Sequence, residues 1–386
     1  MRSIIYLDNA ATTALDPQVL EAMIPYMSSY YGNPSSSYSI GRESKMAIEL
    51  ARKKVAELLG VKPTTIYFTS GGTESNNAAL TSAVRDLGCT HIITSPIEHH
   101  AVLHTVEHLC NEKALTYSYV AINETGKVDL QDLENQLAKK AASGIKCLVS
   151  LMHANNEIGA MLNINLAGEI CNHFKAIFHS DCVQTIGHYP INFAANGVHF
   201  ASASGHKFHG PKGTGILYVS EGTLFKSFIH GGGQERKKRA GTENLHGIIG
   251  FAKALELAMT EHETDRHHIS SLSSYMRHQL MTISPQFSFN SEIDGLYTVL
   301  SVNFPKGTNT DLILALLDRD SICVSGGSAC SSGDDAGSHV ITSLQKNIKG
   351  ATIRFSFSKL TNKEDIDLAL SAIANILQLS PPTVVL

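Results

Sequence analysis

The sequence lacks both the long apolar runs of a membrane protein and the charge excess typical of nucleic-acid-binding proteins. No stretch of the 386 residues approaches the length of a membrane-spanning helix, and MRSIIYLDNAATT at the N-terminus does not resemble a secretion signal. The 31 basic and 35 acidic residues give a net charge of −4. We therefore expect a cytoplasmic protein that binds neither a membrane nor nucleic acid directly. The one basic run, residues 236–239, is interpreted as a solvated turn.

Paired cysteines are also missing. The seven cysteines are an odd number, are scattered and form no CxxC pair, so the sequence supports neither a disulfide framework nor a zinc ribbon. Six of them lie in or beside apolar runs, as core cysteines do: Cys89, Cys110, Cys147, Cys171, Cys182 and Cys323. The seventh, Cys330, lies in SGGSACSSGDDAGSH, residues 325–339. Taken alone, this stretch is interpreted as a surface loop with an incidental thiol.

What the sequence does contain is an alternation of helix and strand patterns. Asp16-Pro17 predicts a helix start leading toward Met27, and a second helical pattern runs from about residue 43 to 59 and ends at Gly60. Short apolar runs follow, with helical segments between several of them: TIYFTS, HIITS, YSYVAI, KCLVSLMH, AIFHSD, HFASAS and GILYV. This order predicts an α/β fold with a mainly parallel sheet covered on both faces.

Two domains are expected from this pattern. Residues 13–260 read as a large α/β domain, and residues 1–12 with 261–386 as a smaller α+β domain that carries the loop at about 325–339. In open α/β sheets, ligands bind beyond the carboxyl ends of the strands. The polar residues that directly follow the strands are therefore the candidates for a site.

A glycine-rich turn follows the first of these strands. Gly71-Gly72-Thr73-Glu74 leads into a helical pattern, and the free N–H groups at a helix start are suited to binding phosphate. The alternative is an ordinary turn with a helix cap. The lysine of a P-loop is absent, and no GxGxxG follows a strand.

Two further groups follow later strands. Asp181 ends an apolar strand, with Gln184 three residues on, and it would pair either with a protonated ring nitrogen or with a basic side chain. Lys207, beside Ser204 and His206, is a candidate Schiff-base lysine with phosphate-binding neighbours; Lys212 is the rival, interpreted as a surface residue. A phosphate site, an acid and a lysine together fit pyridoxal 5′-phosphate, whose protonated ring accepts electrons.

With these residues in view, the chain resembles a cysteine desulfurase of the NifS/IscS type over essentially its whole length. The segments that carry the resemblance occur in the family's order: YLDNAATT, GNPSS, FTSGGTESNN, EHHAV, MHANNEIG, HSDCVQ, SGHKFHGPKG, RAGTEN, SGGSACSSG and IRFSFS. The resemblance implies a fold-type I enzyme that depends on pyridoxal phosphate. Its large domain would contain a seven-stranded, mainly parallel sheet.

The resemblance also implies roles for single residues around the cofactor. Lys207 would bind the aldehyde and move the Cα proton, while Asp181 would hold the ring nitrogen. Gln184 would donate to the phenolic oxygen, and His99 would stack on the ring and assist proton transfer. The remaining cofactor contacts are implied for Gly72, Thr73, Ser204 and His206 at the phosphate and for Asn156.

Three more residues extend the implied site. Thr242 would reach the phosphate of a neighbouring subunit, which implies a homodimer. Arg354 would bind the substrate carboxylate, which a guanidinium can hold through two hydrogen bonds. Cys330 would be the persulfide-forming nucleophile, and a mobile segment would let its thiol reach the cofactor and then an acceptor.

The implied reaction converts L-cysteine to L-alanine and a Cys330 persulfide. The sulfur would pass to an acceptor protein for iron–sulfur cluster assembly or tRNA thiolation, and Cys330 could transiently ligate iron through such a cluster. The alternatives are a selenocysteine lyase or aminotransferase of the same fold, or a non-catalytic platform for sulfur relay. Ala240 in RAGT is closer to NifS-type members, and the ending LSPPTVVL is short of the tail with which IscS-type members dock a scaffold.

His100, His104 and His108 raise the alternative of a zinc site. Their spacing places them on one helix face, but HTVEH is not HExxH, and no acid or cysteine is placed to complete a site. They are interpreted as surface or packing histidines.

Overall fold

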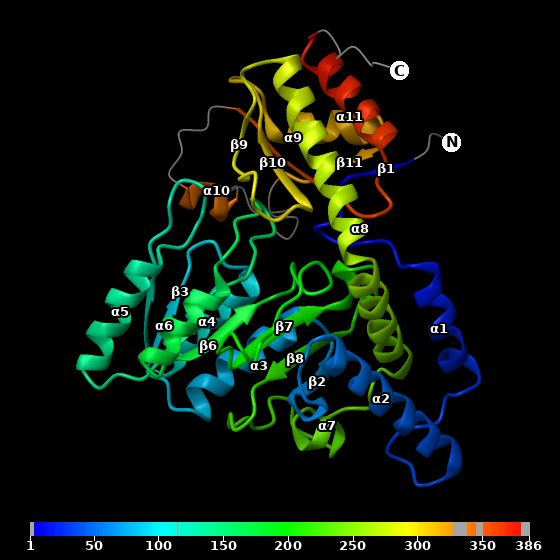
Figure 1. Ribbon diagram of the computed structural model, residues 1–386, viewed down its shortest axis with the longest axis vertical. Coiled ribbons are helices and arrows are strands. Elements are labelled where there is room, and N and C mark those ends of the chain that lie inside the picture. The colour runs from blue at the N-terminus through cyan, green and yellow to red at the C-terminus, as the bar shows by residue number, and fades with distance from the viewer. Residues whose placement is uncertain (1–3, 114, 327–337, 345–349, 380–386) are drawn as a thin grey trace.

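The computed structural model describes residues 4–113, 115–326, 338–344 and 350–379 (Figure 1). Cys330, most of the segment 325–339 and nearly all of the C-terminal LSPPTVVL lie outside the described residues. Among the described helices, none combines the length and the apolar character needed to cross a bilayer.

A seven-stranded sheet forms the centre of the larger core. Its strands, in spatial order, are β2 (Ile66–Thr69), β8 (Gly215–Val219), β7 (Phe200–Ser204), β6 (Ile177–Asp181), β5 (Cys147–Ser150), β3 (His91–Thr94) and β4 (Thr116–Tyr119). The strands from β7 to β4 pair in parallel, and β8 runs antiparallel to both of its neighbours. The predicted mainly parallel sheet of seven strands is confirmed. Edge strand β4 departs from the expected burial, because three of its four residues are exposed.

Alternating strand residues face two layers of helices. Ile93, Val149 and Phe178 pack in one cluster with residues of helices α1, α2, α5, α6 and the start of α8. Their strand neighbours Ile92 and Leu148 pack on the other face against α3 and α4. The bounds of these helices are α1 (Pro17–Ser28), α2 (Ser39–Leu58), α3 (Gly72–Arg85), α4 (His100–Lys113), α5 (Leu130–Ala142), α6 (Ile164–His173) and α8 (Leu245–Ile283). The sheet is therefore covered on both faces, as parallel sheets require.

Local signals explain the start of α1 and the end of α2. The Asp16 side chain accepts a hydrogen bond from the backbone N–H of Gln18, and Pro17 is the first helical residue. Gly60, with φ of +64°, adopts the left-handed conformation that ends α2. The start of α2 was predicted four residues late, because Tyr38 at its N-terminus makes no side-chain cap to mark it.

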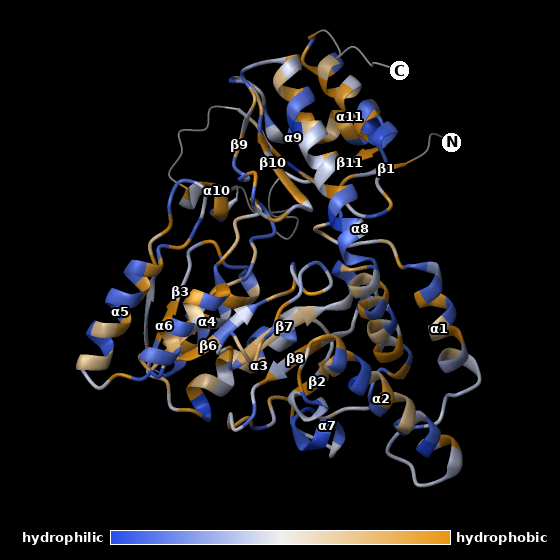
Figure 2. Cartoon of the chain, viewed as in Figure 1, coloured by the Kyte–Doolittle hydropathy of each residue, from blue (hydrophilic) through white to orange (hydrophobic). Residues whose placement is uncertain are grey.

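A second core lies at the other end of the molecule (Figure 1). It contains the antiparallel sheet β12 (Thr352–Ser356), β10 (Val299–Asn303) and β9 (Ser288–Phe289), and the parallel pair β1 (Ile5–Tyr6) and β11 (Ile322–Cys323). Helices α9 (Thr310–Arg319) and α11 (Lys363–Ile376) pack on it, and Figure 2 shows apolar residues along β10 at its centre. The short helix α10 (His339–Ser343) instead packs against Ile97 and Ile158.

Helix α8 connects the two cores. Its first turns, from Leu245 to Leu255, belong to the larger core, and Ile269 to Leu280 belong to the second. At 39 residues it is about 58 Å long. The boundary predicted at residue 260 falls inside this continuous helix, and the division into domains stays a prediction.

Candidate active site

Ten of the twelve predicted site residues line one cavity of about 280 Å³. They are Gly72, Thr73, His99, Asn156, Asp181, Gln184, Ser204, His206, Lys207 and Arg354. The cavity lies at the carboxyl ends of β6 and β7 and at the N-terminus of α3. This is the location that the α/β topology predicts for a ligand.

Lys207 lies in η2 (Gly205–Lys207), the turn that directly follows β7. Its Nζ donates to the backbone oxygens of Ala10, at 2.6 Å, and Ala11, at 2.9 Å. His206 beside it is half-buried, and burial, aided by the nearby Lys207 charge, lowers the pKa of its ring to about 4. The imidazole is therefore neutral near pH 7.

Asp181 ends β6 and is buried. Its Oδ2 accepts a hydrogen bond from Asn76 Nδ2 at 2.6 Å, and its Oδ1 accepts one from the backbone N–H of Val183 at 3.0 Å. The carboxylate is thus fixed in orientation at the cavity wall. Asn76 Oδ1 is buried and has no hydrogen-bond partner among the described residues.

The N-terminus of α3 supplies the predicted anion cradle. Gly72 is the first residue of this 14-residue helix, and Thr73 follows it. A Cβ at Gly72 would lie 2.5 Å from Cγ2 of Val183, so only glycine fits without displacing that side chain. With Ser204 and His206 on the same cavity, free helix N–H groups and hydroxyls form a donor set suited to a phosphate.

His99 and Gln184 line the cavity from other elements. His99 Nδ1 accepts a hydrogen bond from the backbone N–H of Ala101 at 3.0 Å, so a neutral ring carries its proton on Nε2. Burial lowers the pKa of His99, although the Asp181 charge opposes this effect. Gln184 Nε2 donates to the Ala10 oxygen at 3.1 Å.

Arg354 lies on β12, in the second core, and is only 2% exposed. Its Nη2 is 2.7 Å from Asp8 Oδ1, and its Nη1 donates to the Asn156 oxygen at 3.0 Å. Its Nε has no partner among the described residues. The site therefore joins residues of both cores. Asn156 contributes to it through its backbone oxygen, which accepts the hydrogen bond from Arg354.

Two predicted residues do not line this cavity. Thr242 borders a separate cavity of about 140 Å³ together with Arg239 and Glu243. Cys330 lies outside the described residues, so its predicted role as an iron ligand stays a prediction. Near it in the chain, Ser325 pairs with Arg354 through backbone hydrogen bonds of 3.3 and 2.7 Å.

Sequence reasoning missed several cavity residues. Asn76 lies one helical turn beyond Gly72, and this i, i+4 spacing could have indicated it. Glu157 accepts a hydrogen bond from Ser338 Oγ at 2.6 Å, and burial raises the pKa of its carboxyl. His339 lies beside His100, with ring centroids 4.5 Å apart, a pairing that joins residues too distant in sequence to be predicted.

Of the three histidines considered as metal ligands, two pack against each other and the third pairs with an acid. The rings of His100 and His104 lie 4.8 Å apart, and His108 is 3.5 Å from Glu112. Within the part of the chain that the structure describes, no group of three or more histidine, cysteine or acidic side chains is arranged to hold a metal ion.

A buried ion pair between Arg52 and Glu235 was also missed. Both terminal nitrogens of Arg52 lie 2.8 Å from the Glu235 carboxylate, and both side chains are buried. Glu235 directly precedes the basic run, residues 236–239, that was interpreted as a solvated turn. The backbone is left-handed there, with φ of 43° at Glu235, 57° at Arg236 and 64° at Lys237. Arg239 pairs with Glu74 in the first turn of α3. The basic run is therefore a turn attached to the core, not a freely solvated one.

Comparison with known proteins assigns the chain to a family. The family described as aminotransferase class-V matches residues 5–369. A cysteine desulfurase IscS of Dictyoglomus turgidum is 41% identical over 98% of this chain and 95% of its own. The chain belongs to the class-V aminotransferase family, among cysteine desulfurases of the NifS/IscS type.

Solved structures agree with this assignment. A NifS-like protein superposes with a TM-score of 0.90 at 37% identity, covering 97% of this chain and 100% of its own. A structure described as SspA in complex with cysteine superposes with a TM-score of 0.78 at 30% identity, covering 91% of this chain and 98% of that one. The α/β fold that the sequence motifs predict is confirmed.

Proposed function

We propose that this desulfurase family member binds pyridoxal 5′-phosphate in the 280 Å³ cavity and removes sulfur from L-cysteine, releasing L-alanine. The observation that carries the proposal is the convergence of Lys207, Asp181 and the N-terminus of α3 on that cavity. An amine, a fixed carboxylate and a phosphate cradle are the three contacts that this cofactor needs.

The residues present fit the cofactor. Gly72, Thr73, Ser204 and His206 would hold the phosphate, Asp181 the ring nitrogen and Gln184 the phenolic oxygen, with His99 and Asn156 beside the ring. When bound, pyridoxal phosphate supplies an aldehyde that condenses with amines and a ring that accepts electrons from Cα. The Asn76–Asp181 hydrogen bond supports this assignment, because it keeps the carboxylate aimed at the cavity.

Lys207 and Arg354 act on the substrate. Lys207 holds and moves the proton at Cα, since its Nζ lies at the cavity. Arg354, on β12 of the second core, orients the substrate carboxylate. The neighbouring structure described as holding cysteine supports an amino-acid substrate of this size.

Cys330 receives the sulfur. Its thiolate would attack the substrate sulfur, so that the new S–S bond forms as the C–S bond breaks and Cys330 becomes a persulfide. The electron pair of the C–S bond would stay with the substrate Cβ, which takes up a proton and becomes the methyl group of alanine. His99 would assist proton transfer; because its Nδ1 accepts the Ala101 N–H, its neutral ring offers Nε2–H as the donor. The persulfide then passes to an acceptor, either an iron–sulfur scaffold or a tRNA-thiolating enzyme, where Cys330 can transiently contact iron.

The assembly is a cytoplasmic homodimer in this proposal. Thr242 would complete the phosphate site of the other subunit, which agrees with its position away from the cavity of its own chain. Gel filtration with light scattering tests the dimer.

The deciding experiment measures alanine and sulfide released from L-cysteine with a thiol reductant, for the wild type and for Cys330→Ala, together with the visible spectrum of each. Both proteins should bind pyridoxal phosphate, and only the wild type should release alanine and sulfide in equal amounts. If Cys330→Ala is as active as the wild type, the persulfide role is wrong and a lyase or aminotransferase function replaces it.

A further inference from the structure

Residues 8–16 run beside the turn that carries Lys207 and bind it through the side chain of one threonine. The backbone N–H of Thr13 and its Oγ1 both donate to the His206 oxygen, at 2.9 and 3.0 Å. The same Oγ1 accepts a hydrogen bond from the backbone N–H of His209 at 2.7 Å. One hydroxyl therefore connects the two ends of the segment 206–209.

The backbone that Thr13 holds is strained. His209 has φ of +64°, a conformation that is uncommon for a residue other than glycine. Two further contacts hold His209 in addition to the one with Thr13. The His209 backbone oxygen accepts a hydrogen bond from the Asp16 N–H at 3.0 Å, and the His209 ring Nδ1 lies 2.8 Å from the Ala14 oxygen. Three residues of the segment 8–16 thus stabilise a conformation that the turn alone would not favour.

The same segment also contacts the lysine amine. Lys207 Nζ donates to the oxygens of Ala10 and Ala11, and Gln184 Nε2 donates to Ala10 as well. The backbone on either side of Lys207, at His206 and His209, and the Lys207 amine are therefore contacted by one short stretch of chain.

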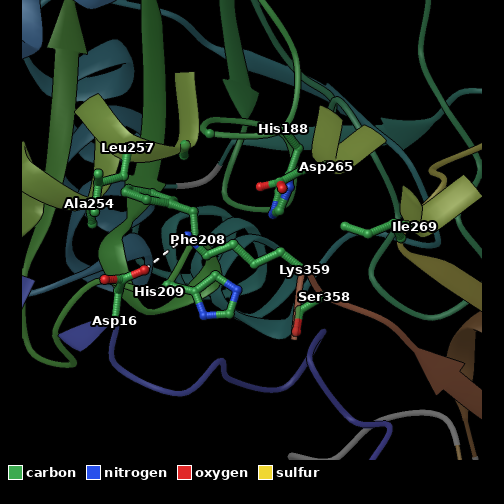
Figure 3. Close-up of a pocket in the computed structure, with 12 residues that line it drawn as sticks. Asp16, His188, Phe208, His209, Ala254, Leu257, Asp265, Ile269, Ser358 and Lys359 are labelled. Carbon is green, nitrogen blue, oxygen red and sulfur yellow. Dashed lines mark ion pairs between the residues drawn. The ribbon is translucent and has the colours of Figure 1, made fainter. Parts of the chain in front are cut away.

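The ends of the segment are attached to the second core. Asp8 pairs with Arg354, and the backbone N–H of Ala10 donates to Ser356 Oγ at 2.8 Å. At the other end, Asp16 lies 2.9 Å from Lys359 Nζ, the ion pair drawn as a dashed line in Figure 3. Figure 3 also shows His209, which lines the same small cavity as Asp16 and Lys359.

We propose that residues 8–16 form a positioning strap that fixes Lys207 relative to Arg354, and that the Thr13 hydroxyl is the contact on which this placement depends. The inference rests on the proposed function of Lys207. Thr13 does not line the cavity and is a positioning residue. Loss of its hydroxyl leaves the His209 N–H without its acceptor and frees the 206–209 turn to relax.

The test compares Thr13→Val with Thr13→Ser in the full chain. In the cofactor-free protein, amide hydrogen exchange of peptides covering residues 205–210 should rise about tenfold in Thr13→Val. After loading with pyridoxal phosphate, kcat should fall by about tenfold or more, while KM for L-cysteine changes less than about threefold. Thr13→Ser keeps the hydroxyl, so its amide exchange, kcat and KM should each stay within about twofold of the wild type.

Thr65→Val is the matched control. Thr65 is 5% exposed against 3% for Thr13, and its Oγ1 bonds the local Lys62 oxygen, away from the cavity. If Thr13→Val does not fold, Thr13→Ala makes the same deletion with a smaller side chain. The strap is wrong if either folded variant matches the wild type in exchange and kcat, or if Thr65→Val changes both as much.

One further measurement separates this inference from the proposed function. Borohydride reduction of the loaded wild type should attach the cofactor mass to the Lys207 peptide. If that mass appears elsewhere or nowhere, the role of Lys207 fails. If it appears on Lys207 and Thr13→Val has no effect on exchange or kcat, the strap alone fails.

Discussion

Asn76 and Asp181, 105 residues apart in the chain, meet in a hydrogen bond of 2.6 Å between Nδ2 and Oδ2. The contact joins the first turns of α3 to the end of β6, so the helix that forms the phosphate cradle also orients the carboxylate. Two of the three features that suggested the cofactor, the phosphate cradle and the acid, are therefore one connected unit.

Replacing Asn76 tests this connection. Asn76→Ala removes the donor and should lower kcat for alanine formation by about tenfold, because Asp181 loses one of its two described hydrogen bonds. The adjacent Asn77 donates to the Thr73 oxygen from an exposed position, so Asn77→Ala is the control and should change kcat less than about twofold. Equal effects of both changes would contradict the prediction.

Gly72 provides a steric test of the cradle. Gly72→Ala places a Cβ 2.5 Å from Val183 Cγ2 and should weaken binding of pyridoxal phosphate about tenfold, measured by titrating the visible absorbance of the cofactor. Val183→Ala removes the opposing methyl groups. The double variant should regain most of the lost affinity, and the crowding explanation is wrong if it binds no better than Gly72→Ala.

The Arg52–Glu235 pair predicts a large effect on stability. Arg52→Met leaves the Glu235 charge buried and should lower the free energy of unfolding by about 3–5 kcal/mol in urea titrations. Arg236→Met breaks the more exposed pair with Glu49 and should cost about 1 kcal/mol or less. A similar loss in the two variants would show that burial does not determine the cost.

Histidine burial predicts how stability depends on pH. His179 lies on β6 between Ser150 and Ser202, and burial lowers the pKa of its ring to about 3. Because an unfolded histidine titrates near 6.5, only the unfolded chain binds this proton between about pH 3 and 6.5. Below pH 6.5, protonation of His179 in the unfolded chain therefore lowers the free energy of unfolding as the pH falls, by at most about 1.4 kcal/mol per pH unit.

His179→Gln should therefore flatten the fall in unfolding free energy between pH 6.5 and 5, measured by urea titration at each pH. The control is the same substitution at the exposed His278 on α8, His278→Gln. An unchanged slope in His179→Gln would contradict the prediction, whatever the variant's stability at pH 7.

The features predicted from sequence are those that neighbouring residues determine. Asp16-Pro17 marks the start of α1, Gly60 the end of α2, and the apolar runs mark the strands. Because the ends of parallel strands meet at one edge, Asp181 and Lys207 could be expected to share a cavity. The family motifs added His99 and Arg354, which no local pattern indicated.

The features that were missed depend on contacts between distant residues. Arg52 and Glu235 are 183 residues apart, and neither sits in a pattern that indicates a buried charge. Residues 8–13 of the strap belong to the family motif YLDNAATT, yet the hydrogen bonds of the strap to His206 and His209 cross more than 190 residues. Spacing along a chain cannot indicate such partners.

The attachment of Asn9 to Ser356 has a consequence for the order in which the nascent chain folds. Asn9 Nδ2 donates to the Ser356 oxygen at 2.9 Å across 347 residues. During synthesis, the larger sheet can form while its N-terminal segment still lacks this partner, since strand β12 leaves the ribosome close to the end. Assembly of the lysine environment is thus one of the last steps of biosynthesis, and a chain that ends before β12 would expose an incomplete site.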